Sequence, residues 1–135
     1  MSFTHLTVLG TVASALAMWF LGALWYSPVA FGPAWMKSVG LSKEKLTANA
    51  QNAMWEGAVA SFVQAVALGV LLSLFHPSSL QEALEICLAA WVALQLPIWL
   101  HQRIYEQRPL ELLLISGGYG LVSILLAGVI VQLAA

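Results

Sequence analysis

Long runs of apolar residues dominate the chain and recur four times. They cover residues 6–26, 53–75, 83–102 and 112–134. Each run is close to the roughly 20 residues that a helix needs to cross about 30 Å of hydrocarbon. The pattern predicts an all-α membrane protein, a bundle of four transmembrane helices forming one domain over residues 1–135.

Proline and glycine residues separate the four runs. Ser27-Pro28 and Gly32-Pro33 follow the first run, His76-Pro77 lies between the second and third, and Pro109 precedes the fourth. Proline disfavours a helical conformation in the residue before it and fits the first turn of a helix. Pro97 lies inside the third run, where we expect it to free a backbone carbonyl and to bend the helix.

The connection between the first two runs is the only sizeable one. Residues 33–46 mix apolar side chains with three lysines. This composition fits a short interfacial helix that lies on the membrane surface. It fits an ordinary polar loop with anchoring aromatic residues equally well, and the sequence leaves both interpretations open.

Composition and charge support the membrane assignment. The chain is 61% hydrophobic and 8% charged, whereas soluble domains carry about 25% charged residues. A soluble protein so poor in charge would expose large apolar patches. The net charge of −1 gives no electrostatic reason to expect nucleic acid as a partner, so the expected surroundings are the lipid bilayer.

The basic residues predict the orientation of the bundle. All of them fall in the first and third connections: Lys37, Lys43, Lys45, Arg103 and Arg108. Cytoplasmic loops carry an excess of Lys and Arg, so we expect these two connections to be cytoplasmic and both termini to lie on the outer side. No basic residue precedes Lys37, so the first run is interpreted as a retained span and not as a cleaved signal peptide.

Small residues mark two surfaces for close helix packing. In the second run they recur at every fourth position: Ala53, Gly57, Ser61, Ala65, Gly69 and Ser73. The fourth run contains Gly117, Gly118 and Gly120. In lipid, small residues let helices approach closely, either within one chain or between chains. Since four short spans enclose little volume, we expect an oligomer.

Candidate ligand or pore residues gather at the expected cytoplasmic level. They are Trp25, Tyr26, Ser27, Glu56, His101 and Arg103, with Gln64 and Gln95 deeper in the membrane. Ionisable groups within spans tend to be functional, and an ion pair between Glu56 and Arg103 is one expectation. The structural alternative is an aromatic belt with snorkelling arginines. For Gln64 and Gln95, an interhelical hydrogen bond is the structural alternative.

Catalytic and metal-binding motifs are absent from the sequence. It contains no nucleophile elbow, phosphate-binding loop or HExxH pattern. The three histidines, His5, His76 and His101, have no metal-ligand spacing. Cys87 is the only cysteine, so no disulfide can form within the chain. We therefore expect no enzyme activity, no metal and no cofactor.

Two segments resemble a bacterial family catalogued as domain of unknown function 1761. The segments are residues 22–36, reading GALWYSPVAFGPAWM, and residues 105–119, which contain YEQRP and end in ISGGY. The family often has a Trp-Leu-Gly-Phe-like run in the third span, where this chain reads Trp91-Val92-Ala93-Leu94. The resemblance implies a small four-span protein and brings no established activity. A bacterial family with several spans implies the bacterial cytoplasmic (inner) membrane.

Two functions fit these observations. The first is a small oligomeric membrane protein that binds or passes a small solute or lipid through the candidate residues at the cytoplasmic level. The alternative is a non-catalytic accessory subunit that docks on a larger membrane complex through the small-residue stripe of residues 53–73.

Overall fold

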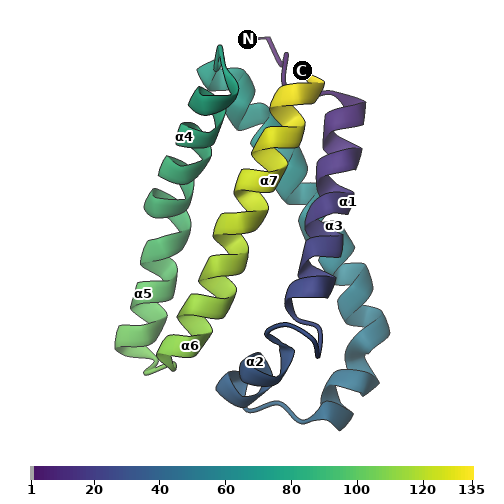
Figure 1. Ribbon diagram of the computed structural model, residues 1–135, viewed down its shortest axis with the longest axis vertical. Coiled ribbons are helices and arrows are strands. Elements are labelled where there is room, and N and C mark those ends of the chain that lie inside the picture. Colours follow the sequence, from purple (N-terminus) through teal and green to yellow (C-terminus); the bar gives the residue numbers. More distant parts are fainter. Residues whose placement is uncertain (1) are drawn as a thin grey trace.

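The computed structural model describes residues 2–135, and all regular structure in that range is helical (Figure 1). In chain order the elements are α1 (Val8–Trp25), α2 (Gly32–Val39), α3 (Lys43–Phe75), α4 (Leu80–Ala90), the π-helical segment η1 (Trp91–Gln95), α5 (Leu96–Tyr105), α6 (Leu110–Leu112), the π-helical segment η2 (Leu113–Gly117) and α7 (Gly118–Ala134). The prediction of an all-α protein is confirmed.

Four stretches of residues 2–135 are long and apolar enough to cross a membrane. They are α1, α3, the continuous stretch Leu80–Tyr105, and Leu110–Leu133, so the chain is a multi-pass membrane protein with the four predicted spans. The two termini and the turn at 76–79 lie at one end of the bundle, here called the termini end. The connections 26–31 and 106–109 lie at the other, the loop end (Figure 1).

Helix α3 begins well before the apolar run that identified it. It starts at Lys43, where the Ser42 hydroxyl accepts a hydrogen bond from the Lys45 N–H at 3.3 Å. Its 33 residues correspond to about 50 Å at 1.5 Å per residue, longer than the hydrocarbon core. The apolar pattern located only the membrane-crossing part, because residues 43–52 are polar.

The first connection contains a short helix, which decides between the two interpretations of residues 33–46 in favour of a helix. That helix, α2, ends at Gly40, which has a left-handed φ of 71°, so Leu46 belongs to α3 instead. At its start, a Cβ added to Gly32 would lie 2.6 Å from the Tyr26 carbonyl oxygen. Only glycine therefore fits where the chain turns back after α1.

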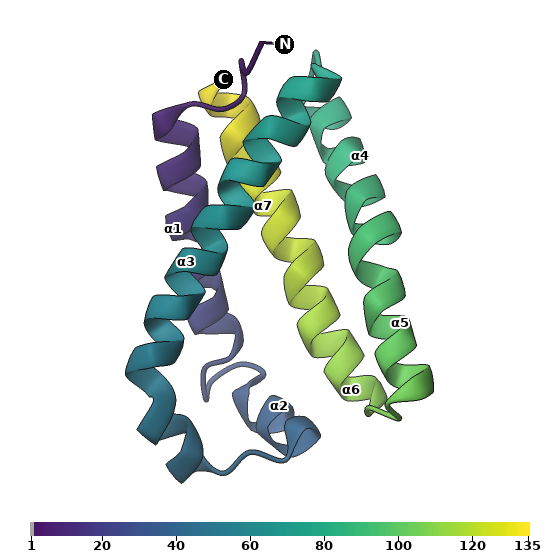
Figure 2. The same cartoon turned by 180° about the vertical axis from the view of Figure 1, so that it is seen from behind.

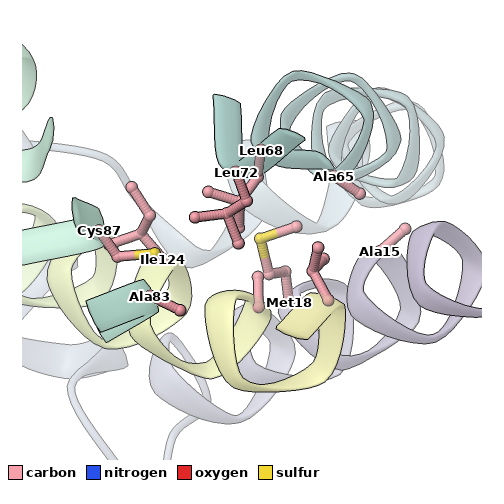
Figure 3. Packing of buried hydrophobic residues seen from close by; sticks show 10 residues of the cluster. Ala15, Met18, Ala65, Leu68, Leu72, Ala83, Cys87 and Ile124 are labelled. Carbon is pink, nitrogen blue, oxygen red and sulfur yellow. The ribbon is translucent and has the colours of Figure 1, made fainter. Parts of the chain in front are cut away.

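The core lies around α7, which packs against α1 and α4, while α1 also packs against α3 (Figure 2). In Figure 3, Met18 of α1 and Leu72 of α3 point toward one another, and Cys87 of α4 lies against Ile124 of α7. The buried cluster consists of Ala15, Met18, Ala65, Leu68, Leu72, Ala83, Cys87, Ile124, Ala127 and Val131. Small residues are common in it, as expected for helices that pack in lipid.

The small-residue stripe of α3 divides into two parts. Toward the termini end, Ser61, Ala65, Gly69 and Ser73 are buried, and a Cβ added to Gly69 would lie 3.2 Å from the His5 carbonyl oxygen. The expected close packing is therefore found there, within the chain. Toward the loop end, Gly57 is only half-buried, and the nearest atoms to an added Cβ belong to Trp19 at 3.8 Å.

Two π-helical segments interrupt the third and fourth spans. In η1 the Leu96 N–H donates to the Trp91 carbonyl, five residues back, so this turn holds one more residue than an α-helical turn. Leu96 and then Pro97 follow this segment. The third span is thus irregular next to Pro97, while the bend that Pro97 was expected to cause stays a prediction. Segments of this kind are frequent at functional sites.

A polar network at the termini end joins three parts of the chain. The His5 N–H donates to Ser73 Oγ at 2.9 Å, and the His5 ring Nε2 lies 2.9 Å from Gln132 Oε1. Gln132 Nε2 donates in turn to the Pro77 carbonyl at 3.3 Å. His5 is buried, so this histidine ties the segment before α1 to α3 and α7.

Candidate binding cavity

A cavity of about 720 Å³ lies in the loop-end half of the bundle. Its walls are α3 on one side and η1 with α5 on the other, and α1, η2 and α7 form its floor. The lining residues are Trp19, Gly22, Ala23, Tyr26, Trp35, Ala53, Met54, Gly57, Ser61, Gln64, Gln95, Trp99, Ser116, Tyr119, Gly120 and Ser123. A volume of this size is typical of small-molecule sites.

The cavity opens sideways, between α3 and α5. These two helices diverge toward the loop end, and α1 and α7, which pack against each other, lie behind them (Figure 2). Both helices carry exposed apolar side chains, including Val63 of α3 at 61% exposed and Ile98 of α5 at 56% exposed. Such exposed apolar side chains are suited to contact with lipid, so the opening faces the bilayer.

Along α3, the cavity extends from Ala53 to Gln64. At 1.5 Å per residue this separation is about 16 Å, roughly half the thickness of the hydrocarbon core. Trp35 of α2 contributes to the lining at the loop end. The cavity therefore reaches from the membrane surface at the loop end to the middle of the bilayer.

Two tyrosines build the floor. Tyr26 donates its hydroxyl hydrogen to Ser116 Oγ at 3.0 Å, and Tyr119 donates to the Met18 carbonyl at 2.9 Å. Their rings lie edge to face, with centroids 5.6 Å apart. A Cβ added to Gly22 would lie 3.1 Å from the Tyr119 hydroxyl oxygen, so this glycine makes room for the ring.

Two tryptophan indoles fix η2 from opposite sides of the fourth span. Trp25 Nε1 donates to the Ile115 carbonyl at 2.8 Å, and Trp91 Nε1 donates to the Gly117 carbonyl at 3.1 Å. Both acceptors belong to η2, whose backbone hydrogen bonding departs from the α-helical pattern. The indoles satisfy these carbonyls at a depth where water cannot.

The glycines of the fourth span allow this close approach. A Cβ at Gly118 would lie 3.4 Å from the Trp25 ring, and a Cβ at Gly117 would lie 3.4 Å from the Trp99 ring. At Gly120 a Cβ would overlap with Gln95 Oε1. All three glycines therefore lie against side chains of neighbouring helices.

The two deep glutamines both line the cavity without bonding to each other. Gln64 lines it from α3 and Gln95 from η1, and Gln95 Oε1 lies against Gly120 of α7. Neither carboxamide hydrogen-bonds to another group of residues 2–135, and neither has a buried side-chain atom that lacks a hydrogen-bond partner. The expected interhelical hydrogen bond is thus not formed, and both side chains belong to the cavity lining.

The charged candidates lie outside the cavity. Glu56, His101 and Arg103 are exposed and do not line it. The expected ion pair between Glu56 and Arg103 is not formed. The Arg103 guanidinium instead donates to the carbonyl of Arg108 at 3.0 Å, across the connection between α5 and α6. The physical reason is the divergence of α3 and α5 at this level.

The remaining candidates have local structural contacts. Ser27 donates its hydroxyl hydrogen to the Leu24 carbonyl at 2.7 Å within the turn after α1. The Trp25 ring packs on Phe31, with centroids 4.8 Å apart, and does not line the cavity. Within residues 2–135, no three His, Cys, Asp or Glu residues are close enough to hold a metal ion.

Three tryptophans of the lining were not among the predicted site residues. Trp19, Trp35 and Trp99 come from α1, α2 and α5. Trp35 and Trp99 looked like members of an interfacial belt, and Trp19 lies deeper in an apolar run. Only the positions of the helices distinguish a tryptophan that faces a cavity from one that faces lipid.

The fold and the cavity define a class: a small multi-pass membrane protein with four helical crossings and a lateral cavity in one half. A family model described as protein of unknown function, DUF1761, matches residues 9–132. The chain belongs to this family, as the resemblance of its two motifs predicted. No curated protein and no solved structure matches the chain.

The two motifs meet in the structure. Residues 22–36 supply Tyr26 and the Trp25 indole, and residues 105–119 supply their partners Ser116 and Ile115. The motifs are distant in sequence and form one contact in space. The atypical run that begins at Trp91 lies in η1.

Proposed function

We propose that this protein is a non-catalytic membrane protein that binds a small solute or lipid in the cavity between α3 and α5. The observation that carries the proposal is the pair Gln64 and Gln95. Two carboxamides line one cavity near the middle of the membrane, without partners in residues 2–135.

The surroundings of these groups support the proposal. The carboxamides are not sealed off, so each can donate to and accept from a polar guest in the cavity. Serine and tyrosine hydroxyls and three indoles line the same space. Apolar sites with a few convergent polar groups are typical of ligand binding.

The test is native mass spectrometry of the protein mildly extracted from its own host. We compare the natural chain with Gly57→Trp, which places a large ring in the cavity. The matched control is Ala67→Trp on the exposed face of α3. We expect a retained small molecule on the natural chain and the control, and its loss from Gly57→Trp. Equal retention by all three would refute the proposal.

The same spectra give the oligomeric state. We propose a homo-oligomer, because four short spans enclose little volume. A mass that corresponds to a single chain, with the ligand still bound, would limit the proposal to a monomeric binding protein.

We further propose that the loop end is cytoplasmic and that the membrane is the bacterial inner membrane. All five basic residues lie at or near the loop end: Lys37, Lys43, Lys45, Arg103 and Arg108. Basic residues near the ends of spans set the orientation.

The alternative function, an accessory subunit that docks through the stripe of α3, has less support. Ser61, Ala65, Gly69 and Ser73 are buried within the chain, so that part of the stripe is not available to a partner. A one-to-one complex with a larger protein in the spectra would favour this alternative.

A further inference from the structure

The sixteen residues that line the cavity include no charged side chain, although the cavity reaches the loop end, where charges are plentiful. Glu56 neighbours the lining residue Gly57 in sequence and is nevertheless exposed outside it. The polar groups that do line the cavity are carboxamides and hydroxyls, which donate and accept hydrogen bonds without net charge.

This lining selects against an ionic guest. A charge placed in a low-dielectric site without an opposite charge is strongly disfavoured. The same cost applies to a phosphate, a carboxylate or an ammonium group. A hydroxyl-bearing or amide headgroup meets matched partners instead, because Gln64 and Gln95 each offer both a donor and an acceptor.

The position of the opening adds a second requirement for the ligand. The opening lies between α3 and α5, two helices that carry exposed apolar residues such as Val63 and Ile98. A guest held by its polar part near Gln64 and Gln95 can therefore extend an apolar chain between the helices into lipid. The aromatic residues Trp19, Trp35 and Trp99 provide flat apolar surfaces for the portion that stays inside.

We infer that the ligand is an uncharged amphiphile, with a hydroxyl- or amide-bearing headgroup in the cavity and an apolar chain that leaves between α3 and α5. This inference rests on the proposed function and specifies its ligand class.

The experiment uses the purified full-length protein and a set of probes with the same twelve-carbon chain. The probes are monododecanoylglycerol, dodecanoate, dodecyl phosphate and dodecylamine, and glycerol is added alone as the headgroup without a chain. Native mass spectrometry measures the fraction of protein that retains each probe. The proteins are the natural chain, Gly57→Trp, Ala67→Trp, Gln64→Leu and Gln95→Leu.

We expect the natural chain to retain monododecanoylglycerol at least tenfold more than any charged probe, and glycerol not at all. Gly57→Trp should lower that retention about tenfold, and Ala67→Trp should leave it unchanged. Each glutamine variant should lower it about fivefold, the effect of losing one hydrogen bond of typical strength.

The experiment distinguishes a wrong ligand class from a wrong binding site. If a charged probe is retained as well as the neutral one and Gly57→Trp removes both, the cavity binds ligands but the inference of an uncharged class is wrong. Retention of glycerol alone at the same level would refute the need for a chain. Retention that Gly57→Trp does not change would refute the cavity itself as the site, and no retention by the natural chain would refute the amphiphile.

Discussion

Cys87 of α4 and Gly128 of α7 form a close contact, which can be tested with variants that move volume from one residue to the other. A Cβ added to Gly128 would lie 2.5 Å from Cys87 Sγ. Optimal contacts between nonbonded heavy atoms lie near 3.5–4.0 Å, so the overlap in Gly128→Ala is about 1.0–1.5 Å. Both residues are buried, so either α4 moves away from α7 or the Cys87 side chain takes another rotamer to relieve it.

We expect Gly128→Ala to lower the free energy of unfolding by about 2 kcal/mol, within the range for overpacked cores. Cys87→Ala removes the sulfur atom and should cost about 1 kcal/mol through lost contacts and the small void. The double variant moves one heavy atom from α4 to α7 at nearly constant volume. Its stability should lie within about 1 kcal/mol of the natural protein.

The assay is equilibrium unfolding in mixed micelles with a rising fraction of denaturing detergent, followed by tryptophan fluorescence. The cycle should give a coupling of about 2 kcal/mol in favour of the double variant. Gly57→Ala provides a control, because Gly57 contacts Trp19 on the other side of the bundle and should combine additively with Cys87→Ala. If the double variant loses the sum of the two single losses, the contact between α4 and α7 is not as close as described.

Three other predictions concern packing, the cavity floor and orientation. Gly69→Ala should destabilise the protein by about 1–3 kcal/mol in the same assay, because its Cβ would press on the backbone of His5; an unchanged stability would contradict this packing. Tyr119→Phe removes the hydroxyl that donates to the Met18 carbonyl and should lower the free energy of unfolding by about 1 kcal/mol. An unchanged free energy would show that this hydrogen bond does not stabilise the fold. Cysteine labelling from each side of the membrane should reach Ser38→Cys from the cytoplasm and Ser79→Cys from outside, and the reverse pattern would invert the proposed orientation.

The number of spans and their approximate positions could be predicted because apolar length is a direct requirement of the bilayer. The start of α3 at Lys43 could not, because its first turns are polar and no membrane constrains them. Small-residue spacing correctly located close packing at Gly69 and Gly120. It could not show that the stripe ends in a cavity at Gly57.

The candidate site was predicted only in part. Tyr26, Gln64 and Gln95 line the cavity, while Glu56 and Arg103, chosen for their similar depth, lie outside it. Depth follows from position along each helix, which sequence supplies. The lateral separation of α3 and α5 depends on the packing of all the helices, which a single sequence does not supply.

The π segment η1 has a consequence for how this family can vary in length. Successive residues of an α-helix are rotated by about 100° around the axis, and a π turn absorbs one additional residue. If the same residues formed an uninterrupted α-helix, everything after η1 would be turned by about that angle, and Trp99 would no longer lie against Gly117. Deleting a single residue from η1 instead removes the residue that the π turn absorbs, so the remaining residues can form an α-helix that keeps Trp99 in place. The angular phase of the third span therefore tolerates a difference of one residue between family members at η1.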